Sequence, residues 1–283
     1  MTDFKGQLLV AVIGKTNAGK STLVNALVGE KVSIISPKKQ TTRENILGIL
    51  NDENYQIVFI DTPGIHKTKN ILDKSMMKQV RVAKEEADLV LFVVDSEKPF
   101  DQEEFETISN MAKNTDVYLL LSKVDKSGYE KVYPLIDKFS KIKEIVEIIP
   151  ISAVKNINID KVLSFLEINL QKCSEDETMY DRETYTDKSV RFMCEELIRE
   201  QCLNQLGDEI PHGIFVEIKK FEEGEDLVSI EADISCKRNN HKSIIIGKQG
   251  LRLKNISTNA RIEIEKLLGV KVFLKLYVYS REK

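Results

Sequence analysis

The sequence GKTNAGKS at residues 14–21 fits the pattern G-x-x-x-x-G-K-[ST] and lies between an apolar run and an amphipathic run. In that setting the pattern is typical of a loop whose backbone amides, with the start of the following helix, surround phosphate groups. Lys20 would reach the terminal phosphates, and the hydroxyl of Ser21 would coordinate magnesium. A chance Gly-Lys-Ser turn is the alternative, and the motifs downstream argue against it. The predicted phosphate-binding residues are Gly14, Lys15, Thr16, Asn17, Ala18, Gly19, Lys20, Ser21 and Thr22.

A second motif, DTPG at residues 61–64, follows the apolar run at 56–60. An aspartate that leaves a buried strand can hold magnesium through a bound water, and the amide of a flexible glycine can sense the third phosphate. Alone, DTPG would be an ordinary turn. After a phosphate loop it predicts a nucleotide-sensing segment made of Asp61, Thr62, Pro63 and Gly64.

Two polar and weakly periodic segments, residues 31–45 and 66–72, flank this motif and are predicted to be mobile loops. The first contains two candidates for a further magnesium ligand, Thr41 and Thr42. The residues themselves do not decide between them.

Base recognition is predicted from SKVD at residues 122–125 and ISA at 151–153. A carboxylate in the plane of the nucleotide accepts two hydrogen bonds from the guanine edge, whereas adenine offers no matching donors. Asp125 is therefore predicted to select GTP, which disfavours an ATP-dependent kinase. The other predicted contacts of the base are Ser122, Lys123, Ser152 and Ala153.

The first 172 residues alternate strand-like and helix-like runs, which predicts an α/β domain with a doubly wound, mostly parallel sheet. The expected strands are 8–13, 46–50, 56–60, 89–94, 117–121 and 147–151, with helices beginning at Ser21, Ser75, Gln102, Tyr129 and Asp160. The acidic stretch 173–187 is the predicted linker. Residues 188–283 form the second predicted domain.

The second domain shows the order helix, strand, strand, helix, helix, strand, which predicts an α+β fold of the type II KH class. The glycine-rich GKQG at residues 247–250 falls between its last two helices. A G-x-x-G loop in this position clamps the backbone of about four nucleotides of single-stranded RNA. By itself the motif is weak, because a plain turn between helices has the same composition. The predicted RNA-binding residues are Ile246, Gly247, Lys248, Gln249, Gly250, Arg252 and Lys254.

The charge distribution supports a polyanion site near the end of the chain. The net charge is −3, but residues 237–283 hold 12 lysines and arginines against 3 glutamates. Such asymmetry is the sequence footprint of nucleic-acid binding, although a solvated helix face would look similar. Residues Ile244, Ile245 and Ile246 would wall a groove for bases or, alternatively, pack in the core.

Composition excludes several classes of protein. Hydrophobic residues make up 42% and charged residues 31%, and no apolar run reaches the roughly 20 residues that span a bilayer. The first residues are predicted to form a buried strand and not a secretory leader. The four cysteines lack the spacing of a zinc site and are expected to be packing residues in a reducing cytosol.

The ordered motifs GKTNAGKS, QTTR, DTPG, SKVD and ISA resemble the translation-factor-like class of bacterial GTPases. With RFMCEELIRE, IIGKQGLRLKNI and LLGVKVFLKLYV downstream, essentially the whole chain resembles the Era-like GTPases, which join a G domain to a KH domain. The resemblance implies slow GTP hydrolysis with magnesium, and binding to the 3′ end of small-subunit ribosomal RNA during maturation of the 30S subunit. It also implies a cytoplasmic protein, with peripheral membrane association in some members.

The resemblance also assigns roles to individual residues. It favours Thr42 over Thr41 as magnesium ligand, and it matches Asn17 to an asparagine that helps hold an activating potassium ion. The residues implied in catalysis are therefore Lys20, Thr42, Gly64 and Asn17. Two departures stand out: Ser122 replaces the usual asparagine, which predicts looser nucleotide binding, and Ile65 replaces the glutamine that orients water in Ras-like proteins.

Overall fold

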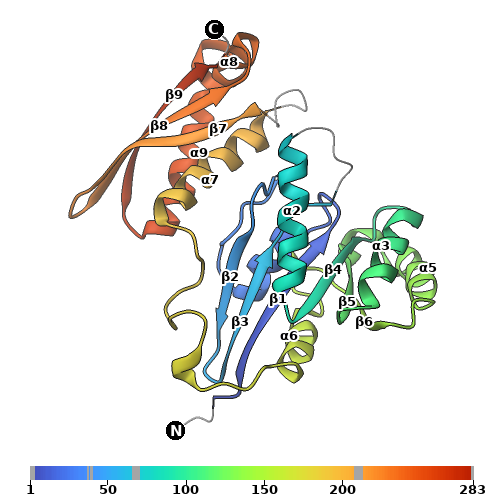
Figure 1. Ribbon diagram of the computed structural model, residues 1–283. Coiled ribbons are helices and arrows are strands. Elements are labelled where there is room, and N and C mark those ends of the chain that lie inside the picture. The colour runs from blue at the N-terminus through green and yellow to red at the C-terminus, as the bar shows by residue number, and fades with distance from the viewer. Residues whose placement is uncertain (1–3, 37, 39–40, 66–70, 207–212, 282–283) are drawn as a thin grey trace. The chain divides into compact units, whose positions relative to one another are not determined.

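The computed structural model describes the chain over residues 4–36, 38, 41–65, 71–206 and 213–281, without the side chains of 71–73. The chain divides into two compact units. Unit 1 comprises residues 1–33 and 42–187, and unit 2 comprises residues 34–41 and 188–283 (Figure 1).

A six-stranded sheet in the order β2-β3-β1-β4-β5-β6 forms the centre of unit 1. Its strands are β1 (Gly6–Gly14), β2 (Ile46–Asn51), β3 (Tyr55–Asp61), β4 (Leu89–Asp95), β5 (Val117–Ser122) and β6 (Ile145–Pro150). Strand β2 is antiparallel to β3, and the other neighbouring strands are parallel. The predicted doubly wound, mostly parallel sheet is confirmed.

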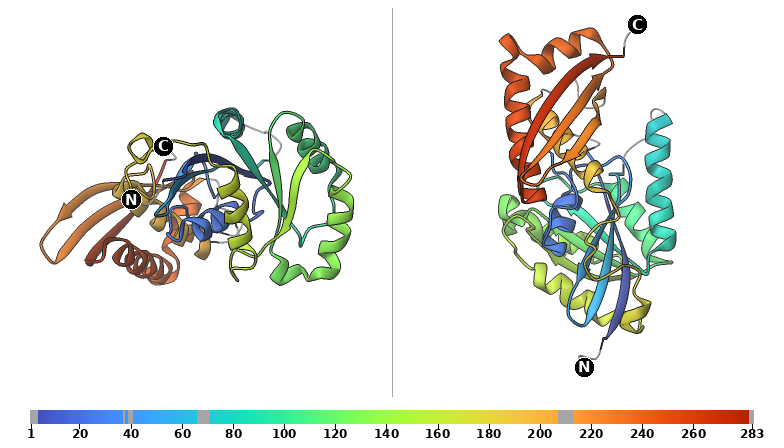
Figure 2. Two further views of the ribbon diagram at one scale, coloured as in Figure 1. Left: turned by 90° about the horizontal axis from the view of Figure 1, so that it is seen from below. Right: turned by 90° about the vertical axis from the view of Figure 1, so that its left-hand side faces the viewer.

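Helices cover both faces of this sheet (Figure 2). Helices α1 (Lys20–Val28) and α6 (Ile159–Ile168) pack on one face, and α2 (Ile71–Glu86), α3 (Gln102–Ala112) and α5 (Tyr129–Phe139) pack on the other. Because successive side chains of a strand point to opposite faces, the continuous apolar runs of β1 and β4 supply both cores. Helix α2 begins before the predicted Ser75, and the short helix α4 (Val124–Ser127) was not predicted.

The acidic segment 173–187, predicted as a linker, lies along β2 and β3 as part of unit 1. The amide of Ile49 donates to the carbonyl of Tyr185 at 3.0 Å, and the amide of Leu47 donates to the Asp187 carboxylate at 2.9 Å. The side chain of Gln56 donates to the carbonyl of Tyr180 at 2.8 Å. The segment therefore covers polar backbone at the edge of the sheet, and unit 1 extends beyond the predicted boundary at residue 172.

Unit 2 contains a three-stranded sheet in the order β7-β8-β9, antiparallel between β7 and β8 and parallel between β8 and β9. Its elements are α7 (Val190–Gln205), β7 (Phe215–Glu223), β8 (Leu227–Cys236), α8 (Asn239–Ile246), α9 (Leu251–Leu268) and β9 (Lys271–Ser280). The helices and the inward side chains of the strands share one apolar core. This order confirms the predicted α+β KH fold.

Three of the four cysteines are buried free thiols in this core: Cys194, Cys202 and Cys236. Burial raises the pKa of the Cys194 and Cys202 thiols to about 12, so both stay protonated and unreactive at neutral pH. Their packing role agrees with the sequence.

Residues 34–41 group with unit 2 through helix α7. The amide of Ile35 donates to the Glu200 carboxylate at 2.7 Å, and the Arg199 guanidinium donates to the carbonyl of Thr41 at 2.6 Å. Both charged side chains are buried. Among the residues described, no helix is long and apolar enough to cross a membrane.

Candidate functional site

The predicted nucleotide motifs meet at one edge of the unit 1 sheet. Strands β1, β3, β4 and β5 run parallel, so their carboxyl ends emerge on the same side. These ends carry Gly14, Asp61, Asp95 and Ser122. Ligands of open α/β sheets bind in the crevice at this edge.

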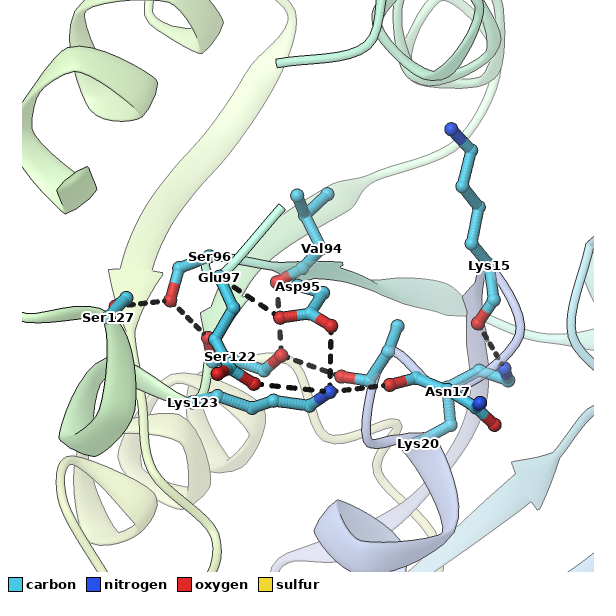
Figure 3. Close-up of polar contacts among 11 residues, drawn as sticks. Lys15, Asn17, Lys20, Val94, Asp95, Ser96, Glu97, Ser122, Lys123 and Ser127 are labelled. Atoms are coloured by element: carbon cyan, nitrogen blue, oxygen red, sulfur yellow. Dashed lines mark hydrogen bonds and ion pairs between the residues drawn. The ribbon is translucent and has the colours of Figure 1, made fainter. Parts of the chain in front are cut away.

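Lys20 lies buried at the centre of the phosphate loop (Figure 3). Its ammonium donates to the carbonyls of Gly14 at 3.1 Å and Lys15 at 3.0 Å. Burial lowers the pKa of Lys20 to about 8, and the nearby Asp61 and Glu104 carboxylates oppose that shift. Incoming phosphate oxygens would give this desolvated cation the negative partners that two neutral carbonyls do not supply.

Three oxygen ligands predicted for magnesium lie together. The Ser21 hydroxyl is 2.6 Å from Asp61 Oδ2 and 3.0 Å from Thr42 Oγ1. Thr41 is turned elsewhere, because its hydroxyl donates to the carbonyl of Lys38 at 2.8 Å. The structure therefore brings Thr42, and not Thr41, to Ser21.

The surroundings of Asp61 fit a cation at this cluster. Burial raises the pKa of Asp61, opposed chiefly by the hydrogen bond from Ser21 and by the charge of Lys20. Its Oδ1 atom is buried and has no hydrogen-bond partner among the described residues. A hard divalent ion with bound water would satisfy that oxygen, and hydroxyl and carboxylate oxygens are the ligands magnesium prefers.

The DTPG segment packs directly against the phosphate loop. A Cβ atom on Gly64 would lie 2.5 Å from Thr16 Cα, so only glycine allows this approach. The amide of Ile65 donates to the carbonyl of Gly14 at 2.9 Å, and the Thr62 hydroxyl donates to the carbonyl of Val12 at 2.7 Å. Thr62 thus anchors the segment through its side chain, and buried Pro63 follows it. Residues 66–70 of the predicted mobile loop lie outside the described residues.

The two base-recognition motifs are adjacent. The amide of Val124 donates to the carbonyl of Ile151 at 3.2 Å, which joins the SKVD loop to ISA. Asp125 is exposed in the first turn of α4, where its carboxylate can meet a base. Ser152 is buried and Ala153 is half-buried beside it.

Ser122 still ties this loop to the phosphate loop. Its hydroxyl lies 2.6 Å from the carbonyl of Ala18 and 3.1 Å from that of Val94, so the smaller side chain keeps a cross-link between the loops (Figure 3). The looser nucleotide binding expected from this replacement stays a prediction.

Sequence reasoning missed the acidic partners of the phosphate loop. The Lys15 ammonium lies 2.6 Å from Asp101 and 3.8 Å from the buried Glu104, so its side chain is paired with helix α3. Burial raises the pKa of Glu104 to about 7, and the charge of Lys15 opposes this. Asp95 was missed as well, although an aspartate at the end of an apolar run is the signal that identified Asp61.

In unit 2 the G-x-x-G segment forms a sharp connection between α8 and α9. Gly247 has φ 72°, and a Cβ atom there would lie 2.7 Å from Arg252 Cβ. Lys248 and Gln249 are exposed at its tip, and Gly250 ends it. Arg252 donates to the carbonyl of Ile244 at 2.6 Å and so braces the turn.

The neighbouring side chains separate into core and surface. Ile245 is fully buried, whereas Ile246 remains half-buried and Lys254 is exposed. One of the three isoleucines therefore belongs to the core alone, and the others can reach a ligand.

Comparison with known proteins agrees with both units. A family model described as 50S ribosome-binding GTPase matches residues 9–123, and a KH domain model matches residues 209–281. The GTPase Era of Ruminiclostridium cellulolyticum is 42% identical over 271 residues, covering 95% of this chain and 90% of the relative. Era of Clostridium botulinum is 43% identical over 277 residues, covering 96% and 92%.

Two solved structures match nearly the whole length of the chain. Era in complex with MgGDPNP and nucleotides 1506–1542 of 16S ribosomal RNA superposes with a TM-score of 0.90 at 39% identity, covering 97% of this chain and 93% of the other. A variant of Aquifex aeolicus Era bound to GDP.AlF4− gives a TM-score of 0.90 at 38% identity, covering 96% and 93%. With a GTPase domain followed by a KH domain, this chain belongs to the family of the GTPase Era.

Proposed function

We propose that this chain is a GTP-driven switch that binds single-stranded RNA at the 3′ end of small-subunit ribosomal RNA and assists maturation of the 30S subunit. The observation that carries the switch is the cluster of Ser21, Thr42 and Asp61 oxygens beside Lys20. The related Era structure with a 16S RNA fragment supports the choice of RNA.

Different residues of the site would bind the phosphates, the base and the magnesium ion. Lys20 and the loop amides would hold the phosphates, Asp125 and Lys123 the base, and Ser21, Thr42 and Asp61 the magnesium ion. That ion neutralises charge on the β- and γ-phosphates when bound. Gly64, held against Thr16, would place its amide where it can report the third phosphate.

Hydrolysis is expected to be slow. Ile65 lies at the position where Ras-like proteins use glutamine, and a hydrocarbon side chain cannot orient water. The backbone amide of Ile65 donates to the carbonyl of Gly14. We infer that catalysis rests on charge supplied around the phosphates, from Lys20 and from an activating potassium ion at Asn17.

Potassium is expected to raise the turnover number by roughly ten-fold or more over sodium at equal ionic strength, because positive charge stabilises the transition state. Phosphate release at saturating GTP measures this effect. Asn17→Ala should reduce the potassium rate toward the sodium rate, since the exposed Asn17 side chain is the proposed ligand. Equal rates of the unmodified protein in the two salts would contradict the idea.

Acidic replacement of the loop tip tests the RNA site. Lys248→Asp/Gln249→Asp is expected to weaken binding of a labelled single-stranded RNA from the 16S 3′ end by roughly 100-fold, because carboxylates would face its phosphates. Fluorescence anisotropy measures the affinity, and GTP hydrolysis without RNA should be unchanged. The control is Lys219→Asp/Lys220→Asp, a double acidic change on exposed β7 positions of the same unit. Retained affinity in the loop variant would show that the G-x-x-G loop does not hold the RNA.

The peptide bond between Thr41 and Thr42 joins the two units and supports coupling between nucleotide binding and RNA binding. Thr42 lies at the proposed magnesium cluster in unit 1, and the preceding Thr41 belongs to unit 2, where Arg199 of α7 holds its carbonyl. A change at Thr42 on loss of the third phosphate would act on the segment that α7 holds. We therefore propose that nucleotide state alters RNA affinity, in contrast to an RNA-binding protein in which nucleotide is only structural.

The proposed location is the cytoplasm, where GTP, ribosomal RNA and a reducing environment occur together. Peripheral association with the inner face of the cell membrane is retained from the family resemblance as part of this proposal. Fractionation of cells into membrane and supernatant would test it.

A further inference from the structure

A carboxylate at the end of β4 holds the base-recognition lysine (Figure 3). Asp95 Oδ2 lies 2.7 Å from the Lys123 ammonium, and the Asp95 side chain is only 10% exposed. Its other oxygen, Oδ1, accepts the amide of Glu97 at 3.0 Å. Asp95 is therefore fixed by its own loop and presents one oxygen to Lys123. A partly buried, charge-assisted hydrogen bond of this length is among the stronger polar contacts in proteins.

Lys123 is held at a second point. Its ammonium also donates to the carbonyl of Asn17 in the phosphate loop at 2.8 Å. The backbone of Lys123 has φ 63°, which turns the chain sharply into α4 and Asp125. A lysine side chain is flexible and loses rotamer entropy when ordered. The contacts with Asp95 and Asn17 therefore hold the aliphatic part of the Lys123 side chain in one position before a nucleotide binds.

The serine in SKVD makes this second cross-link important. An asparagine amide offers two donors and one acceptor, whereas the Ser122 hydroxyl has one proton to share between the carbonyls of Ala18 and Val94. Ser96 adds support by donating to the Ser122 carbonyl at 2.5 Å. The hydrogen bonds that Lys123 makes with Asp95 and with Asn17 are a further polar connection between the SKVD loop and the phosphate loop.

We propose that Asp95 is a positioning residue for guanine recognition, which orders Lys123 along the base and compensates for the serine at position 122. Asp95 acts through Lys123 and does not itself contact the base. The inference rests on the proposed role of Lys123 in holding guanine.

Asp95→Asn is the sharpest test, because the amide keeps the shape and can still accept from Glu97 through its oxygen. Its nitrogen would then face the Lys123 ammonium, donor against donor. We expect the dissociation constant of a fluorescent GDP analogue to rise about ten-fold, mainly through faster dissociation. The KM for GTP should rise by a similar factor, while turnover at saturating GTP changes less than about two-fold.

Glu97→Gln is the matched control. Glu97 lies 3.9 Å from the same ammonium and is 37% exposed, so its loss should change the dissociation constant less than about two-fold. Circular dichroism and the melting temperature of each nucleotide-free variant establish that it is folded.

A double-mutant cycle separates the possible results. If Asp95 acts through Lys123, Asp95→Asn adds no further loss in a Lys123→Ala background. Unchanged affinity in folded Asp95→Asn, or additive losses in the double variant, would overturn the proposal. If Lys123→Ala itself binds GDP normally, the role of Lys123 in holding guanine fails, and the inference falls with it.

Discussion

Asp125→Asn is expected to lower the affinity for GDP and GTP by roughly 10²- to 10³-fold, because the carboxylate is the proposed partner of two donors on the guanine edge. An asparagine replaces one acceptor with a donor. That donor matches the oxygen that xanthine carries in place of the guanine amino group. Xanthine nucleotides should therefore bind the variant better than guanine nucleotides do.

Competition between unlabelled nucleotides and a fluorescent GDP or XDP analogue measures this change of preference. Asp125 is exposed in the short α4 helix, so the variant should fold and melt like the unmodified protein. Asp137→Asn, the same change at an exposed position of α5, is the control. Unaltered preference for guanine in Asp125→Asn would show that another group reads the base.

Lys20→Ala is expected to reduce kcat/KM for GTP by roughly 10³-fold, equivalent to about 4 kcal/mol. The alanine removes the only side-chain cation proposed to lie on the terminal phosphates. Phosphate release and calorimetric titration with GDP measure the loss. Lys131→Ala, at an exposed position of α5, should leave both unchanged. Near-normal turnover in Lys20→Ala would contradict the proposed phosphate site.

Lys20 should also affect how the stability of the nucleotide-free protein depends on pH. Lys20 has a pKa of about 8 in the folded state, below the ordinary value of 10.5, because burial disfavours its charge. The charged form therefore penalises folding below about pH 8, and raising the pH from 8 to 10.5 relieves that penalty. Denaturant unfolding of the parent protein should show that the free energy of unfolding rises over this pH range. The part of the rise that Lys20 contributes should be absent in Lys20→Ala. An equal rise in stability in Lys20→Ala over this pH range would contradict the assignment of the rise to Lys20.

The sequence predicted the sheet and the nucleotide motifs because both depend on local patterns. Continuous apolar runs identified β1, β3, β4 and β5, and parallel strands bring their carboxyl ends together whatever the loops do. Gly64 and Gly247 were singled out by motif, and each occupies a place that a Cβ atom would obstruct. A requirement for glycine of this kind can be predicted from the neighbouring residues of the motif.

Pairings between distant residues could not be predicted in this way. Lys15 appears in the motif as a phosphate-loop residue, yet its ammonium is committed to Asp101. Nothing in the local sequence links Asp95 to Lys123. The acidic stretch at 173–187 has the composition of a linker, and only the sheet edge it covers makes it part of unit 1. The composition of a segment indicates how unfavourable its burial is. The partners of its hydrogen bonds, in contrast, depend on which parts of the chain the fold brings beside it.

RNA affinity measured in two nucleotide states tests the proposed switch most directly. The protein would be saturated with GDP or with a nonhydrolysable GTP analogue, and titrated into labelled single-stranded RNA from the 16S 3′ end. The switch predicts that the two dissociation constants differ by roughly 5- to 150-fold, the usual range of coupling between sites. Equal dissociation constants with both nucleotides would contradict it and leave an RNA-binding protein in which the nucleotide is only structural.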